Sequence, residues 1–132
     1  MRIRATGLVV SKGAILLVRE HSGMWLLPGG SIERNELAIV AAIRALHEIT
    51  GIAAHAAASL FEHVSAHHIH HVFRIAVPDN TRPRTDARFS AVQWVAPQEL
   101  YRLQITPGTE AILARAMAES SSLRRHEVAA TV

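Results

Sequence analysis

The sequence predicts a single α/β domain, and three observations support this prediction. Runs rich in Val, Ile and Leu, typical of strands, are separated from alanine-rich stretches, typical of helices, by segments that contain Gly and Pro. The chain of 132 residues has the size of one domain, and chains of this order bury roughly 70% of their unfolded surface. No internal repeat or linker divides the sequence. We therefore expect one domain over residues 1–121 and a flexible tail over residues 122–132.

The first half of the chain is expected to form a hairpin, a loop and a helix. Two strands are predicted within residues 3–20, joined by a turn at Ser11–Gly13. Residues 21–31 are expected to form a loop. The helix that follows should begin at a cap provided by Asn35 and end at Gly51.

The second half is expected to contain three more strands and two more helices. β-branched and aromatic residues indicate the strands, and a proline in the first turn indicates the shorter helix. The predicted elements are strands within residues 52–65, 68–77 and 89–97, a loop over 78–86, a short helix over 97–103 and a longer helix over 106–120.

Composition restricts the possible partners only broadly. The net charge is +3, with nine histidines in addition, which suits an anionic small molecule as well as nucleic acid. The absence of cysteine excludes disulfides and thiolate zinc sites and fits a reducing compartment. No apolar run approaches the ~20 residues of a membrane helix, and the N-terminus is typical of a strand rather than of a signal peptide. We expect a cytoplasmic protein without a membrane partner.

The segment LPGGSIERNELAIVAAIRALHEITGI carries the most specific spacing in the chain. Its members are Gly30, Glu36, Arg44, Leu46, Glu48, Gly51 and Ile52. The array resembles the signature of the Nudix hydrolase family, which is Gly, five residues, Glu, seven residues, then Arg-Glu-apolar-any-Glu-Glu-any-Gly-apolar. Where the family has Glu twice more, this chain has Ala45 and Ile49.

The resemblance extends over most of residues 1–120. MWLLPGG before the array, VQWVAPQELYRL in the late strand and short helix, and ITPGTEAILARA in the closing helix resemble the family in the same order. The resemblance implies a Nudix-type α/β/α sandwich with a mixed β-sheet. It also implies hydrolysis of a nucleoside diphosphate linked to another moiety, Mg²⁺ or Mn²⁺ as the metal, and often a homodimer.

The missing acids bear directly on catalysis. Mg²⁺ stabilises a diphosphate under attack by water, and it needs hard oxygen ligands. Glu residues three and four apart place such ligands on one helix face, where this chain retains only Glu48. The other members of that face are apolar: Ala38, Ala41, Ala45 and Ile49. The resemblance leaves Glu48 and the backbone oxygen of Gly29 as metal ligands. Because loss of a base costs about 10²–10⁴-fold in rate, we expect weak, altered or absent hydrolysis.

Besides Glu48, four charged residues lie in or near the array: Glu33, Glu36, Arg44 and Asp86. In the family, Glu36 and Arg44 belong to the catalytic array and mainly orient the loop against the helix. The family often carries one more carboxylate just before Trp94, but that segment has no acid, and Asp86 lies upstream in a loop. Glu33 is either a displaced ligand or a solvated loop acid.

Five histidines form a second cluster: His63, His67, His68, His70 and His71. Strand alternation places His68 and His70 on one face and His71 on the other, which we expect to face the core because it also carries Phe73 and Ile75. A pair two residues apart can bind Zn²⁺, Mn²⁺ or Ni²⁺ in place of the lost carboxylates. The alternatives are contact of His70 or His71 with substrate, and ordinary exposed strand histidines.

The remaining substrate-binding candidates are Arg19, Trp25 and Gly30. Arg19 either contacts a phosphate or is a solvated strand-end side chain, and Trp25 either borders the substrate cleft or anchors the core. Gly30 allows backbone to approach phosphates. The basic cluster within residues 82–88 lacks interleaved aromatic residues, so no nucleic-acid partner is predicted.

Three hypotheses on function remain open. The first is a hydrolase that uses Mg²⁺ or Mn²⁺ held by Glu48, Gly29 and the substrate. The second is a non-catalytic Nudix-fold domain that binds a nucleotide or a partner. The third is a hydrolase with a His-assisted transition-metal site. The sequence does not identify the substrate.

Overall fold

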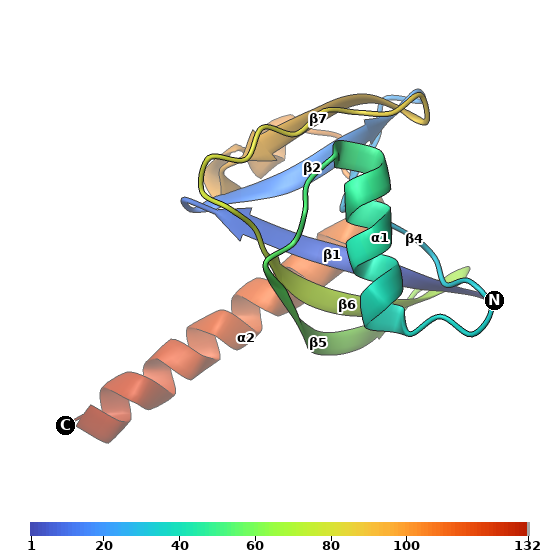
Figure 1. The fold of residues 1–132 in the computed structure, drawn as a ribbon. Coiled ribbons are helices and arrows are strands. Elements are labelled where there is room, and N and C mark those ends of the chain that lie inside the picture. The colour runs from blue at the N-terminus through green and yellow to red at the C-terminus, as the bar shows by residue number, and fades with distance from the viewer. Residues whose placement is uncertain (132) are drawn as a thin grey trace.

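The computed structural model describes the backbone of residues 1–131 and the side chains of residues 1–119. In chain order the elements are β1 (Arg2–Ser11), β2 (Ala14–Glu20), β3 (Trp25–Leu26), β4 (Gly29–Ser31), α1 (Ala38–Thr50), β5 (Ala56–Val64), β6 (His68–Ala76), β7 (Phe89–Val95), the 3₁₀-helix η1 (Pro97–Arg102) and α2 (Pro107–Thr131). Figure 1 shows the strands between two helices, with α1 in front of the sheet and α2 behind it. The predicted α/β/α sandwich is confirmed.

Strand β1 lies at the centre of the sheet and makes its pairing mixed. It runs parallel to β6 and antiparallel to β4 and to the start of β2. β5 extends the sheet beyond β6, while β3 and β7 both pair with β2. At the β1–β2 turn, Lys12 and Gly13 have positive φ angles of 51° and 76°, as a two-residue hairpin turn requires. The turn predicted at Ser11–Gly13 is confirmed.

Each face of the sheet packs against a helix, and a hydrophobic core fills the space between them. On the side of α1, Leu46 packs in a cluster with Phe73 and Ile75. On the side of α2, Ile112 packs in a second cluster with Val72. The predicted core face of β6 is therefore correct for Phe73 and Ile75, but the prediction of one core face is incomplete. Val72, on the opposite face, is buried as well because α2 covers it.

Helix α1 begins later than predicted. It starts at Ala38, with Leu37 at the cap position and no side-chain hydrogen bond to the first turn. The prediction that Asn35 caps the helix is wrong, because Asn35 adopts a positive φ of 64° in the turn before it. Asn tolerates this left-handed conformation better than most residues. The predicted end is confirmed, since Gly51 takes the left-handed cap conformation with φ 77°.

The predicted loop over residues 21–31 contains two short strands. β3 pairs with β2, and β4 pairs with β1. A side chain at Gly29 would collide with the carbonyl oxygen of Ala5, so only glycine lets β4 approach β1 this closely. Local sequence gave no sign of these strands, because each has only two or three residues.

The other predicted elements are confirmed: strands β5, β6 and β7, the loop before β7, η1 and the start of α2. The domain boundary at residue 121 and the flexible tail over residues 122–132 stay predictions, because the side chains of that segment, and residue 132 altogether, lie outside the described residues. Within the described part of the chain, no helix is both long and apolar enough to cross a membrane.

Candidate functional site

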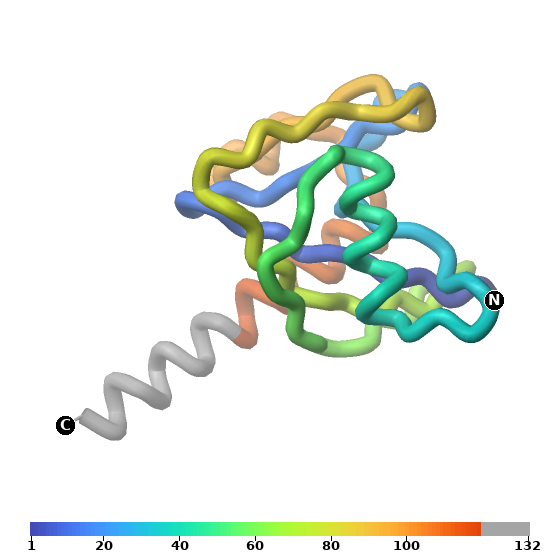
Figure 2. The backbone as a smooth tube through the Cα atoms, viewed as in Figure 1, coloured from blue at the N-terminus to red at the C-terminus, as the bar shows by residue number. Residues whose placement is uncertain are grey.

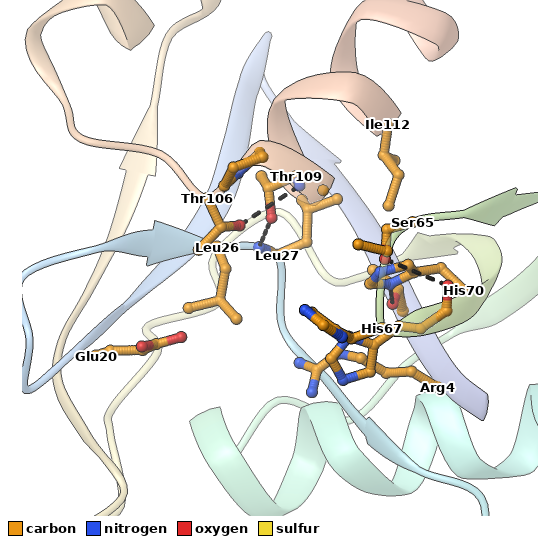
Figure 3. A pocket seen from close by; sticks show the side chains of 15 residues that line it. Arg4, Glu20, Leu26, Leu27, Ser65, His67, His70, Thr106, Thr109 and Ile112 are labelled. Atoms are coloured by element: carbon orange, nitrogen blue, oxygen red, sulfur yellow. Dashed lines mark hydrogen bonds between the residues drawn. The ribbon is translucent and has the colours of Figure 1, made fainter. Parts of the chain in front are cut away.

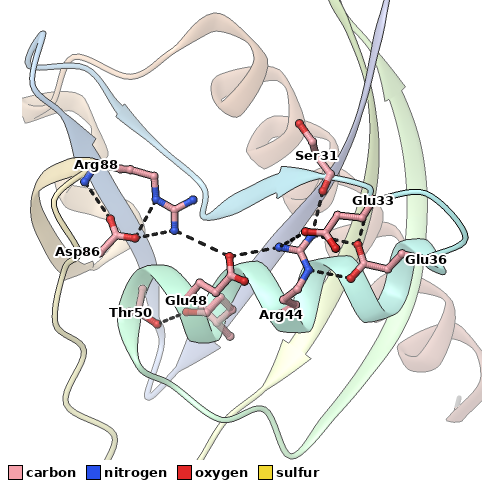
Figure 4. Close-up of polar contacts among 9 residues, drawn as sticks. Ser31, Glu33, Glu36, Arg44, Glu48, Thr50, Asp86 and Arg88 are labelled. Atoms are coloured by element: carbon pink, nitrogen blue, oxygen red, sulfur yellow. Dashed lines mark hydrogen bonds and ion pairs between the residues drawn. The ribbon is translucent and has the colours of Figure 1, made fainter.

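Arg44, in the middle of α1, is the centre of a polar network (Figure 4). Its Nε and Nη2 donate to the two carboxylate oxygens of Glu36 at 2.7 and 2.9 Å, which is a bidentate pair. Nη2 also donates to the carbonyl of Ser31 at 3.0 Å. Hydrogen bonding from Arg44 lowers the pKa of Glu36 to about 2, so this carboxylate stays charged across the neutral range. Glu36 and Arg44 therefore join the loop before α1 to the helix.

Glu48, the acid retained from the array, lies between two guanidinium groups. Its Oε2 is 3.2 Å from Nη1 of Arg44 and 4.0 Å from Nη2 of Arg88. Arg88 in turn donates from Nε to Oδ2 of Asp86 at 2.8 Å, and this guanidinium lowers the pKa of the Asp86 carboxyl. The Glu48 side chain is 47% exposed. It is accessible, but its charge is already balanced by cations of the same chain.

The loop that carries Asp86 and Arg88 docks on the end of α1, as the backbone path in Figure 2 shows. The amide of Asp86 donates to the carbonyl of Ile49 at 3.1 Å, and that of Arg84 to Thr50 at 3.0 Å. The last carbonyls of a helix have no partner within it, so these bonds satisfy them. The sequence predicts only a solvated basic loop here, because no local pattern signals a contact with a distant helix.

The two positions where the resemblance expects Glu lie inside the core. Ala45 is 3% exposed and Ile49 is 1% exposed, and both pack against Val18 of β2. Partly buried side chains complete this cluster: Leu26, Phe89 and Val92. Gly30 of β4 also lies close, since an added Cβ would be 3.3 Å from Cβ of Ala45. The apolar face of α1 is therefore packed against strands.

These residues do not fit the metal site that the resemblance implies. Mg²⁺ and Mn²⁺ take several hard oxygen ligands. The donors here are the carboxylate of Glu48, which has two arginines beside it, and the backbone of Gly29. Glu33 is 69% exposed and lies 3.7 Å from Arg44, so it too pairs with a guanidinium. Within residues 1–119, no group of three or more His, Cys, Asp or Glu side chains is placed to hold a metal ion.

Strand β6 separates the histidines as alternation predicts. His71 lies on the face of Phe73, with Nδ1 3.3 Å from Oε1 of Glu62. His70 lies on the other face, where Nδ1 is 3.0 Å from Oγ1 of Thr6. Burial, and next the charge of Arg4, lowers the pKa of His70 to about 4, so its imidazole is neutral at pH 7.

The imidazole of His70 has two neighbouring imidazoles. Its ring centroid is 5.6 Å from that of His68 and 6.0 Å from that of His63. This is the place where the third hypothesis expects a transition metal. The three rings do not form a metal-holding group in the part of the chain that the structure describes.

A pocket of about 470 Å³ lies beside His70, between β1, β6 and the start of α2 (Figure 3). Arg4, Glu20 and His68 contribute polar groups to its walls, and Leu26 contributes apolar surface. Leu26 also packs in the cluster of Ala45 and Ile49. Leu26 therefore lies between the pocket and the face of α1 on which the family carries its acids.

Neither Arg4 nor Glu20 is among the site residues predicted from the sequence. A signal for Arg4 exists in the alternation of β1, which places Arg4 and Thr6 on the same face as buried Leu8. Two consecutive polar side chains on a core-facing row indicate a cavity or a buried polar contact. Glu20, at the end of β2, carries no comparable signal.

Of the five predicted substrate-binding residues, His70 lines the pocket, whereas Arg19, Trp25, Gly30 and His71 do not. Trp25 is 9% exposed and belongs to the core cluster under α2, as its alternative interpretation predicts. Its backbone bonds to Gln104 at 2.8 Å and to Thr106 at 3.0 Å, which fixes the start of α2 beside the pocket. Arg19 is exposed on β2, and its side chain forms no hydrogen bond or ion pair with the described residues.

The profile of the NUDIX domain family matches residues 1–116. No curated protein matches the chain. Among solved structures, a protein described as a nudix hydrolase family member from Chromobacterium violaceum is 23% identical with a TM-score of 0.78, and the match covers 95% of this chain and 87% of that one.

Two further solved structures carry more specific descriptions. A MutT NUDIX hydrolase from Burkholderia pseudomallei is 27% identical with a TM-score of 0.74, over 86% of this chain and 95% of that one. A bifunctional NMN adenylyltransferase/ADP ribose pyrophosphatase from Francisella tularensis, complexed with AMP and a Mn ion, is 22% identical with a TM-score of 0.72. That match covers 89% of this chain and 41% of the other. The folds agree throughout.

Proposed function

Because the chain belongs to the NUDIX domain family, we propose that it binds a nucleoside diphosphate linked to another moiety, and that it hydrolyses this ligand slowly. The observation that carries the proposal is the position of Leu26, which lines the pocket and also packs against Ala45 and Ile49. A ligand that fills the pocket touches Leu26, and behind Leu26 lies the face of α1 where the family carries Glu and this chain carries Ala45 and Ile49.

The chemistry of the reaction explains why hydrolysis should be slow. A water oxygen must bond to phosphorus while the bridging P–O bond breaks, and the proton of that water must reach a base. The family's metal supplies Lewis-acid stabilisation of the phosphoryl oxygens when bound. In this chain the retained carboxylate of Glu48 faces Arg44 at 3.2 Å and Arg88 at 4.0 Å. Its Oε2 is engaged by guanidinium donors, and loss of a base costs about 10²–10⁴-fold.

One observation favours a second candidate, a metal-assisted hydrolase that uses Mg²⁺ or Mn²⁺. Glu48 is 47% exposed, and Asp86 reaches the same Arg88 guanidinium from the other side. If substrate phosphate draws Arg88 away, Asp86 loses its guanidinium partner and Glu48 keeps only Arg44 at 3.2 Å, which leaves carboxylate oxygens for a hard cation. The Mn ion in the Francisella tularensis protein is consistent with this candidate.

Binding and turnover, measured separately on the full chain, test the proposal. Calorimetric titration in EDTA with ADP-ribose, a nucleoside diphosphate sugar and a dinucleoside polyphosphate should show binding of at least one compound. Turnover with Mg²⁺ or Mn²⁺ should be about 10²–10⁴-fold below that of a NUDIX enzyme with all its Glu residues, assayed in parallel. No binding of any compound would refute the proposal.

A matched pair of variants separates the two candidates. Glu48→Gln removes the retained acid, and Arg34→Gln changes an exposed residue of the preceding turn as a control. Fast metal-dependent turnover that Glu48→Gln abolishes and Arg34→Gln retains would establish the second candidate. Unchanged ligand binding in both variants is the result expected from the first.

A further inference from the structure

The pocket contains a charged group that the rest of the described chain leaves without a partner. Arg4 projects from β1 into the cavity (Figure 3), and its side chain forms no ion pair or hydrogen bond with residues 1–119. Glu20, also in the lining, acts on Arg4 through its charge but does not lie within ion-pair distance. Burial lowers the pKa of Arg4 from its ordinary value of 12.5, yet a guanidinium stays charged at neutral pH.

An unpaired guanidinium in a cavity is a strong recognition element. It carries five N–H donors in a fixed planar fork, and the fork matches the oxygens of a carboxylate or phosphate. Charged donors that are partly removed from water and left unpaired cost free energy. An oxyanion that enters the pocket therefore gains a bidentate contact and removes that cost. Among the described residues, Arg4 has no partner for a structural ion pair, which is the usual role of such an arginine.

The groups around Arg4 also favour an anion. Arg2 and the N-terminal ammonium lie close enough for their charges to lower the pKa of His68, after the larger effects of burial and Arg4. Met1 and Arg2 line a second hollow, which shares residues 66–68 with the pocket. Glu20 is the one acid in the lining of the pocket, against these several cations.

His70 provides a hydrogen-bonding group on the same wall. Thr6 engages its Nδ1 at 3.0 Å, which leaves Nε2 without a partner in the described part of the chain. Gly108, in the first turn of α2, lies beside this imidazole, because a Cβ at that position would be 3.4 Å from Nε2, an ordinary van der Waals contact. The ring is thus held in place with Nε2 available to a ligand.

We propose that Arg4, with Nε2 of His70 beside it, binds a phosphate group of the ligand directly and without a metal ion. The inference rests on the proposed function, because it concerns the same pocket and the same ligand. Glu48 is engaged by Arg44 and Arg88, so it does not hold a metal ion that would bind the phosphate. Arg4 provides this phosphate recognition instead.

Titration with inorganic pyrophosphate and with ADP, both in EDTA, tests the assignment. Wild-type protein should bind both, and Arg4→Gln should weaken both at least about tenfold. Arg4→Lys should give an intermediate loss, because lysine keeps the charge but not the fork. Arg34→Gln, which changes an exposed arginine outside the pocket, should leave both affinities unchanged.

A second measurement does not depend on how the variants fold. Pyrophosphate added to the wild-type protein should shift the imidazole NMR signals of His68 and His70 and leave exposed His55 unaffected. Three results would overturn the inference: no pyrophosphate binding in EDTA, equal binding by Arg4→Gln, or unshifted His70. If a nucleoside diphosphate compound still binds Arg4→Gln with wild-type affinity, this inference fails and the proposed function stands. If no such compound binds the wild type, the proposed function fails.

Discussion

The edge of α1 and the pocket beside β6 both carry charged residues, but they differ in how those charges are paired. At the edge of α1, each acid of the network lies within ion-pair distance of Arg44 or Arg88. In the pocket, Arg4 has no ion-pair partner among the residues described, although Glu20 lines the same cavity. The acids of the first region are all paired with guanidinium groups, whereas the pocket contains a guanidinium without an ion-pair partner among the described residues.

From this difference we infer that the array keeps its structural residues although two of its acids are replaced. Glu36 and Arg44 still hold the loop against the helix, as their bidentate contact shows. The positions that should carry metal ligands, Ala45 and Ile49, have become part of the core. Arg4, which has no ion-pair partner among the described residues, is the reason we propose the pocket as the region that recognises an anionic ligand.

Ile49→Glu should have the largest effect, because it places a carboxylate where the side chain is 1% exposed. The change removes buried apolar surface and adds a charge without a partner. We expect the free energy of unfolding to fall by about 3–5 kcal/mol. Urea denaturation followed by circular dichroism measures this loss.

Val40→Glu is the matched control for this substitution. Val40 lies on the same helix and is 47% exposed, so the expected change in unfolding free energy is within about 0.5 kcal/mol. A fully stable Ile49→Glu protein that gains Mg²⁺-dependent hydrolysis would show that this face of α1 is an open cleft, and the contrast between the two regions would disappear.

Arg44→Ala should have the next largest effect, because it removes the centre of the network. Glu36 is 11% exposed and would lose both hydrogen bonds from Arg44. The melting temperature at pH 7 should fall by about 4–8 °C. The pKa of Glu36 is about 2 in the folded state against an ordinary 4.5, so the pair's stabilisation is complete above pH 4.5 and is lost as the pH falls through 2.

Thermal melts of the wild type and Arg44→Ala over this pH range provide the measurement, with Arg34→Ala as the exposed control. The difference between the wild type and Arg44→Ala should shrink as the carboxylate of Glu36 becomes protonated. A difference that keeps its full size at the acidic end would assign the effect to packing of the Arg44 side chain rather than to the ion pair.

Much of the fold could be predicted because its signals are local. The hairpin at Ser11–Gly13 and the end of α1 at Gly51 each depend on a few adjacent residues that adopt positive φ. The start of α1 could not be predicted in this way, because Asn35 suits both a helix cap and a left-handed turn. The contact of Glu36 with Arg44, eight residues later, holds the turn in place, and local sequence does not reveal its geometry.

The candidate site was harder to predict because its groups meet across the chain. Arg4 lies opposite His70 through the register of two parallel strands, which no local pattern fixes. Arg88 reaches Glu48 because its loop docks on the end of α1. The spacing of the array did indicate the missing acids, and the structure adds that the replacement at Ile49 is buried.

A smaller, pH-dependent effect is expected at His70. Burial, and next Arg4, holds its pKa at about 4 against an ordinary 6.5. Between these values the unfolded chain takes up a proton that the folded one does not, so His70 makes stability fall as the pH drops from 6.5 to 4. His70→Gln should flatten the melting temperature over this window, and His55→Gln, at an exposed position, should not. An unchanged slope in His70→Gln would show that this imidazole is freely protonated in the pocket.

Glu48→Gln should have the smallest effect on stability, because its side chain is 47% exposed and its contact with Arg44 is an i,i+4 pair at the surface. Such pairs contribute about 0.3–0.5 kcal/mol.

The same variant also tests whether ligand binding belongs to the pocket or to the edge of α1, because a ligand that binds only the folded state raises the melting temperature. Millimolar Mg²⁺ should raise it in neither the wild type nor Glu48→Gln, since Arg44 and Arg88 already neutralise this carboxylate. Pyrophosphate should raise it equally in both, since its expected site is at Arg4. A rise with Mg²⁺ confined to the wild type would instead make the edge of α1 the ligand site.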